Sequence, residues 1–157
     1  MTQYDDYDGL NLILVEDETL VSMDLEATLE EYGHRVIGVA SHVERALEHI
    51  AGAGRALDAV LLDLTLAGQS ARPVAERLER QGVPYVMVTG LDEAQVRQQG
   101  FSGRYVPKPY HPEAVREALS SVAADLGRAR RVRQAPSPVA PLAVTSPYCA
   151  SSSCVSR

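Results

Sequence analysis

Five short apolar runs, each followed by an amphipathic stretch, constrain the fold of this chain more than any other feature. The runs lie at residues 12–15, 36–39, 59–62, 85–88 and 105–106. Within each run the apolar residues are continuous and do not alternate with polar ones, which is typical of strands buried on both faces of a parallel sheet. We therefore expect five buried strands joined by helices.

The stretches between these runs show helical spacing. Apolar residues recur at spacings of four and three between positions 21 and 32, and Gly33 predicts the end of that helix. Ser41 followed by Glu44 is a capping box, which predicts the start of a second helix. Further helices are expected around Val74 and Leu78, over residues 92–99, and from Pro112 onward.

Five strand–helix units in this order predict an α/β fold. We expect a doubly wound five-stranded parallel sheet of order 2-1-3-4-5, with right-handed crossovers and helices on both faces, as in flavodoxin-like folds. Such folds bind their ligands at the carboxyl ends of the strands. Polar residues next to the ends of the five runs are therefore the first candidates for a functional site.

Composition divides the chain into a folded body and flanking segments. We expect residues 1–9 to be disordered, residues 10–126 to form one domain, and residues 127–134 to extend the last helix with basic side chains. Residues 135–157 contain four prolines and no acidic residue, and they predict a disordered tail rich in proline and serine.

Charge and cysteine content exclude several classes of function. The net charge is −6, but five arginines beyond Asp125 conceal a charge of −11 on residues 1–126. A body that acidic repels phosphate backbones, so direct binding of nucleic acid is not expected. No apolar run approaches the roughly 20 residues of a membrane span, and the first residues are unlike a secretory signal, so we expect a cytoplasmic protein without membrane insertion. Cys149 and Cys154 are too few for a disulfide scaffold or a zinc site.

Three acids and one lysine fall at the predicted strand ends. Glu16 and Asp17 follow the first strand, Asp63 follows the third, and Lys108 follows the fifth. Neighbouring carboxylates repel one another unless a cation neutralises them, so this cluster predicts a Mg²⁺ site. Lys108 is the one lysine against fourteen arginines, which indicates that a compact ammonium suits this position better than a planar guanidinium.

Four motifs at these strand ends resemble the receiver domain of two-component response regulators. They are Leu14-Val15-Glu16-Asp17-Glu18, Leu61-Leu62-Asp63-Leu64, Val88-Thr89-Gly90 and Val106-Pro107-Lys108-Pro109. The likeness extends from about Leu10 to Leu126, and four motifs in this order are strongly specific. It implies a stand-alone receiver, without an output domain, that acts in phosphorelay signal transduction.

The resemblance implies how phosphorylation would occur and be sensed. Asp63 would be the phosphoacceptor, and Thr89 and Lys108 would bind the phosphoryl group. Tyr105 would act with Thr89 as a conformational switch. The Lys108–Pro109 peptide bond would be cis.

The resemblance also implies a ligand set for Mg²⁺. Asp17 and Asp63 would bind the cation directly, Glu16 would act through water, and the backbone carbonyl of Thr65 would be the third protein ligand. The loop after the acceptor departs from the common pattern, because residues 65–68 lack the proline that many members carry before the glycine. We therefore expect a locally altered start of the third helix.

The implied function is that of a single-domain response regulator. It would receive its phosphoryl group from a histidine kinase or a histidine phosphotransfer protein and would signal to a downstream protein through its fourth helix, fifth strand and fifth helix. A phosphorylation-dependent homodimer is compatible with this role. The chain would be a switch that assists its own phosphotransfer and dephosphorylation, and not an enzyme in the usual sense.

Two alternatives remain open from the residues. A pseudo-receiver would bind a partner without being phosphorylated. A Mg²⁺-dependent aspartyl phosphatase of the haloacid dehalogenase kind would need a second acid two residues after the nucleophile, where this chain has Thr65. Asp17 and Asp63 could also simply cap helices, although capping does not explain a lysine that converges on both.

Overall fold

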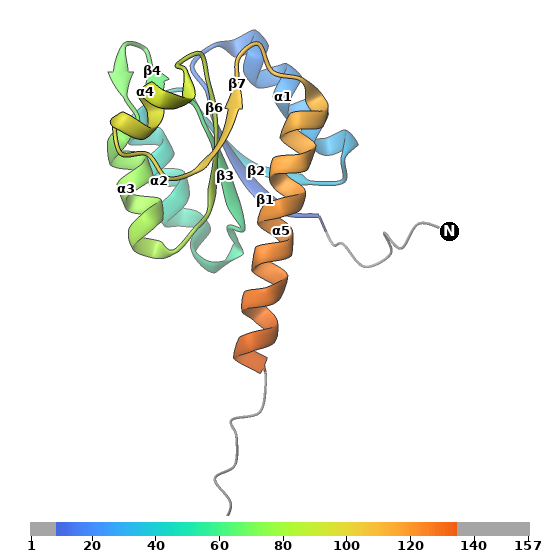
Figure 1. Cartoon of the computed structure of the whole chain (residues 1–157). Helices are drawn as coiled ribbons and strands as arrows, with labels where there is room; N and C mark the ends of the chain where they lie inside the picture. Colours follow the sequence, from blue (N-terminus) through green and yellow to red (C-terminus); the bar gives the residue numbers. More distant parts are fainter. Residues whose placement is uncertain (1–8, 135–157) are drawn as a thin grey trace, which may run out of the picture.

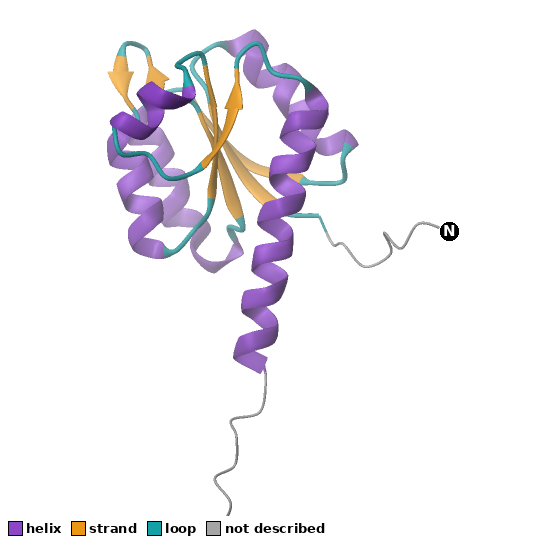
Figure 2. Cartoon of the chain, in the orientation of Figure 1, coloured by secondary structure: helices purple, strands orange, loops and turns teal. Residues whose placement is uncertain are grey.

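The computed structural model describes residues 9–134 and contains a five-stranded parallel sheet between two layers of helices (Figures 1 and 2). The strand order is β2-β1-β3-β6-β7. Because β6 and β7 are the fourth and fifth strands of this sheet, the predicted order 2-1-3-4-5 is confirmed. The strands are β1 (Asn11–Val15), β2 (Arg35–Ala40), β3 (Ala59–Leu62), β6 (Tyr85–Thr89) and β7 (Arg104–Pro107).

Helices cover both faces of the sheet. α1 and α5 pack on one face, and α2, α3 and α4 pack on the other (Figure 1). Among residues 9–134 the helical segments are α1 (Thr19–Glu31), α2 (Val43–Ala53), the 3₁₀ turn η1 (Gly54–Ala56), α3 (Arg72–Gln81), α4 (Glu93–Gln98) and α5 (Pro112–Gln134). None of these helices has the length and apolar character needed to cross a membrane.

Side chains of the central strands alternate between two cores. In β1, Leu12 and Leu14 belong to the core beneath α1 and α5, whereas Ile13 and Val15 belong to the core beneath α2 and α3. All four residues of β3 are buried. Each central strand therefore supplies apolar side chains to both faces, which explains why its apolar run is continuous.

β2 differs from the central strands because it lies at the edge of the sheet. Ile37 and Val39 are 37% and 38% exposed. Val36 pairs with Leu12 and Gly38 pairs with Ile13, so that Ile37 is bulged out of the register. The expectation that residues 36–39 are buried on both faces is therefore wrong.

The helix ends follow the sequence signals with one exception. Asp92 caps α4 in a capping box, in which its side chain accepts the backbone N–H of Gln95 at 2.8 Å and the Gln95 side chain accepts the N–H of Asp92. The capping box predicted at Ser41 is wrong. His42 is the N-cap of α2 and makes no capping hydrogen bond with its side chain, while Ser41 Oγ pairs with His42 Nδ1 at 3.2 Å.

α5 continues without a break past residue 126 to Gln134, and it projects beyond the sheet in Figure 1. Arg130 on this extension lies 3.1 Å from Asp58, which precedes β3. The expectations for residues 1–8, for residues 135–157, and for Cys149 and Cys154 lie outside the described residues.

A small antiparallel hairpin between β3 and α3 was not predicted. It consists of β4 (Thr65–Leu66) and β5 (Gln69–Ser70). Ala67 and Gly68 form its turn with φ of 48° and 81°, so both central residues are left-handed, as in a type I′ turn. The hairpin lies directly before α3, where the sequence predicted an altered start of the third helix. Leu66 is 1% exposed and packs the hairpin against the core.

Candidate functional site

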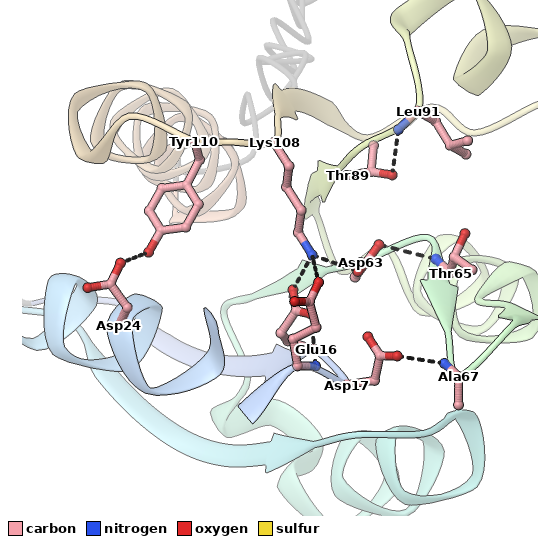
Figure 3. Close-up of polar contacts among 11 residues, drawn as sticks. Glu16, Asp17, Asp24, Asp63, Thr65, Ala67, Thr89, Leu91, Lys108 and Tyr110 are labelled. Atoms are coloured by element: carbon pink, nitrogen blue, oxygen red, sulfur yellow. Dashed lines mark hydrogen bonds and ion pairs between the residues drawn. The ribbon is translucent and has the colours of Figure 1, made fainter. Parts of the chain in front are cut away.

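The carboxyl ends of the strands bring the candidate side chains to one edge of the sheet (Figure 3). Glu16 and Asp17 follow β1, Asp63 follows β3, and Lys108 follows β7. One carboxylate oxygen from each of the three acids lies within 4.8 Å of the other two. The structure thus brings together three acids and places one ammonium beside them.

Lys108 contacts two of these three acids. Its Nζ is 2.8 Å from Asp63 Oδ2 and 2.7 Å from Glu16 Oε2, and the Lys108–Pro109 peptide bond is cis. Burial lowers the pKa of the ammonium, but hydrogen bonds to Asp63 and Glu16 outweigh this effect, and the net pKa is raised. The lysine therefore remains charged and neutralises part of the acidic group.

Glu16 is the most buried of the three acids, with a side chain 1% exposed. Burial raises its pKa, although the hydrogen bond to Lys108 opposes the shift. Its Oε1 accepts the backbone N–H of Glu18 at 3.1 Å. Its Oε2 is buried, and its partner is the Lys108 ammonium at 2.7 Å.

Backbone amides of the hairpin contact the other two acids. The Thr65 N–H donates to Asp63 Oδ1 at 3.2 Å, and the Ala67 N–H donates to Asp17 Oδ2 at 2.8 Å (Figure 3). The resemblance gave Thr65 a role through its carbonyl, whereas the contact recorded here is made by its N–H. The sequence did not predict the contact of Ala67, because this residue lies 50 positions from Asp17 and no local pattern indicates that the two meet.

Thr89 and Tyr105 contact the chain between β6 and α4. Thr89 is buried, and its Oγ1 accepts the N–H of Leu91 at 3.3 Å. The Tyr105 hydroxyl donates to the carbonyl of Leu91 at 2.8 Å. The Lys108 N–H donates to the Thr89 carbonyl at 2.8 Å, but within residues 9–134 no hydrogen bond joins the Thr89 hydroxyl to Asp63 or Lys108. Both proposed switch residues therefore hold the same backbone position of this connection.

Two further contacts border the site. Glu18, the N-cap residue of α1, places its Oε1 3.9 Å from Lys108 Nζ. The Tyr110 hydroxyl donates to Asp24 of α1, and burial together with this hydrogen bond raises the pKa of Tyr110. A cavity of about 520 Å³ opens here, lined by Val21, Asp24, Lys108, Pro109 and Tyr110.

Comparison with known families agrees with this geometry. The family model of the response regulator receiver domain matches residues 12–120. This chain belongs to the response regulator receiver family. The phyllosphere-induced regulator PhyR of Methylorubrum extorquens is 32% identical over 112 residues, which is 69% of this chain and 42% of that protein. This chain therefore spans less than half the length of this curated relative.

Solved structures give the same result for the fold. SdrG from Sphingomonas melonis Fr1 superposes with a TM-score of 0.64 at 30% identity, covering 74% of this receiver and 98% of SdrG. The response regulator PhyR from Brucella abortus superposes with a TM-score of 0.66 at 30% identity, covering 80% of this receiver and 51% of the PhyR chain. The flavodoxin-like receiver fold predicted from the four motifs is confirmed.

Proposed function

We propose that this receiver is a phosphoacceptor switch that takes a phosphoryl group onto Asp63 from a histidine kinase or a histidine phosphotransfer protein. The observation that carries the proposal is the contact between Lys108 Nζ and Asp63 Oδ2 at 2.8 Å, beside Glu16 and Asp17. An ammonium in contact with the acceptor is a donor for phosphoryl oxygens, which need charge stabilisation during transfer.

The acidic group fits Mg²⁺. Its donors are hard carboxylate oxygens, one from each of three acids, and they lie within 4.8 Å of one another. Asp17 and Asp63 would hold the cation, together with the Thr65 carbonyl, and Glu16 would act through water. When bound, Mg²⁺ neutralises the carboxylates and the negative phosphoryl oxygens.

The side chains of this receiver supply the rest of the reaction. An Asp63 oxygen attacks phosphorus and forms the new P–O bond, while the P–N bond to the donor histidine breaks and its electrons stay on the imidazole. The Lys108 ammonium, which contacts Glu16 and Asp63 before transfer, then donates hydrogen bonds to the phosphoryl oxygens. Thr89 accepts the Leu91 N–H with a lone pair, so its own proton is free to donate to the phosphoryl group.

The same hydroxyl would transmit the signal. When Thr89 turns toward a phosphoryl group, its contact with the Leu91 N–H weakens, and the Tyr105 hydroxyl is bonded to that same residue. Two arrangements of this connection would then be favoured to different degrees with and without phosphate. The surface that changes is α4, β7 and α5, where a downstream protein or a second phosphorylated copy would bind.

Phosphorylation by acetyl phosphate in the presence of Mg²⁺ tests this proposal. Intact-mass measurement should show one added phosphoryl group on the wild type and none on Asp63→Asn. Asp58→Asn is the matched control, because Asp58 lies at the opposite end of β3, and it should be labelled like the wild type. Chelation of Mg²⁺ should abolish labelling of the wild type and of Asp58→Asn.

Two outcomes would contradict the assignment. Equal labelling of wild type and Asp63→Asn would remove Asp63 as acceptor. A wild type that takes up no phosphate, either from acetyl phosphate or from a phosphorylated histidine phosphotransfer protein, would indicate a pseudo-receiver that binds its partner without phosphorylation.

A further inference from the structure

The β4–β5 hairpin reaches both aspartates of the site from one short segment. Its first strand bonds Asp63 through the Thr65 N–H, and its turn bonds Asp17 through the Ala67 N–H. Asp17 belongs to the connection between β1 and α1, so the hairpin joins two loops that are 50 residues apart in sequence. Pairing between Leu66 and Gln69 and burial of Leu66 hold the turn in place.

The turn adopts a conformation that does not favour alanine. Ala67 has a φ of 48°, and it is the one non-glycine residue with positive φ among residues 9–134. A Cβ is unfavourable in the left-handed region, and glycine or asparagine is preferred at this position of a type I′ turn. The turn nevertheless presents the Ala67 amide directly to a carboxylate of the site, and strained backbone of this kind is concentrated at functional positions.

Each aspartate has one carboxylate oxygen bonded to the hairpin and one that does not contact the hairpin. Asp63 uses Oδ1 for the hairpin and Oδ2 for Lys108. Asp17 uses Oδ2 for the hairpin, and its Oδ1 makes no hydrogen bond to any part of the described chain. An amide that grips one carboxylate oxygen fixes the direction of the other, which is how hydrogen-bond partners outside the ligand set orient metal ligands.

We propose that the β4–β5 hairpin is a positioning element for the divalent cation, and that the Ala67 N–H holds Asp17 in the orientation that binds it. This inference rests on the proposed function, since it concerns the cation of the phosphoacceptor site. Ala67 acts through Asp17, and its side chain is not involved.

The direct test removes the amide and keeps the side chain. The full chain is prepared with the residue-67 amide replaced by an ester, using the hydroxy-acid analogue of alanine, and Mg²⁺ affinity is measured by isothermal titration calorimetry without phosphate donor. We expect affinity to fall about tenfold. Ala67→Gly is the matched control: it retains the N–H and tolerates positive φ, so its affinity should stay within about twofold of the wild type.

Hydrogen exchange of the Ala67 amide gives a readout on the unmodified wild type. Because coupling is reciprocal, Mg²⁺ should slow exchange at Ala67 several-fold, and Asp17→Ala should accelerate it and remove its response to Mg²⁺. The amide of Gln95, which donates to the N-cap residue Asp92 of α4 away from the site, should not respond.

The outcomes separate this proposal from the proposed function. If the wild type binds Mg²⁺ and the ester binds it equally well, or if exchange at Ala67 ignores Mg²⁺, the positioning role is overturned while the phosphoacceptor proposal stands. If the wild type binds no Mg²⁺, both are overturned.

Discussion

The two ends of β1 use polar side chains in opposite ways. Where β1 begins, the Leu10 N–H donates to His34 Nδ1 at 3.1 Å, and the Asn11 N–H donates to Asp58 Oδ2 at 2.9 Å. These side chains satisfy backbone donors that have no strand partner. Where β1 ends, Glu16 instead faces other carboxylates and one ammonium. Polar groups at the first end support the fold, whereas those at the second end form the proposed phosphoacceptor site.

The two ends also respond to pH with opposite sign. Burial raises the pKa of Glu16, so the stabilisation from its neutral form is present at low pH and is lost as pH rises through the raised value. Burial lowers the pKa of His34, so the stabilisation from its neutral form is present above the ordinary value of 6.5 and is lost as pH falls below it. Measurements at several pH values can therefore distinguish the two ends.

The largest effect is expected at the site end, from Lys108→Met. Methionine keeps most of the apolar stem but removes the charge that neutralises Glu16 and Asp63. We expect the free energy of unfolding in urea at neutral pH to fall by about 2–3 kcal/mol, because two buried carboxylates lose their partner. The loss should shrink as the pH is lowered, because loss of the Lys108 charge raises the pKa of Glu16 further and its neutral form then needs no ammonium.

An exposed ion pair is the control for Lys108→Met. Arg45 pairs with Glu48 on α2 with both side chains more than half exposed, so Arg45→Met should change the free energy of unfolding by less than about 1 kcal/mol. If Lys108→Met changed the free energy of unfolding at neutral pH as little as Arg45→Met does, the buried carboxylates would not need the ammonium for stability. The contrast between the two ends of β1 would then disappear.

An intermediate effect is expected at the opposite end, from Asp58→Ala. This substitution leaves the Asn11 N–H without its acceptor. It also removes the ion pair between residue 58 and Arg130 of α5. We expect a loss of about 1–2 kcal/mol in urea unfolding, mostly from the backbone donor. Asp58→Asn, which can still accept the N–H, should lose less than half of that, and an equal loss in both variants would assign the effect to Arg130.

The smallest effect is expected from His34. Between about pH 7 and pH 5.5 the wild type should lose on the order of 1 kcal/mol, the value of one buried hydrogen bond, as protonation removes the Nδ1 acceptor of the Leu10 N–H. His34→Asn does not titrate, so the difference between wild type and variant should isolate this loss from the other histidines. A pH profile identical in the two proteins would show that the pKa of His34 is the same in the folded and unfolded states.

The sequence predicts the sheet well because burial on both faces leaves a strong local pattern. It fails at β2, where an edge strand keeps apolar residues such as Ile37 at the surface. It also fails at Ser41, because the local pattern matched a capping box that the backbone does not form. Both errors come from tertiary context that a short window of sequence does not contain.

The candidate site divides in the same way. The topology rule alone places Glu16, Asp17, Asp63 and Lys108 at one edge, because each follows a strand whose end is predictable. The hairpin could not be predicted from the sequence. Its strands of two residues are too short to show a period, and alanine does not indicate a left-handed turn. Contacts such as that of Tyr110 with Asp24 depend on how α1 packs against the end of β7.

The solitary lysine makes the site chemically addressable. Lys108 carries the one side-chain primary amine of the chain, so an acylating reagent has few competing targets. Its pKa is raised and its side chain is 17% exposed, which leaves little of the nucleophilic free amine while the carboxylates hold it. The rate of amine acylation at Lys108 therefore reports how tightly the carboxylates hold that ammonium, and acylation itself would remove the positive charge beside the proposed acceptor Asp63.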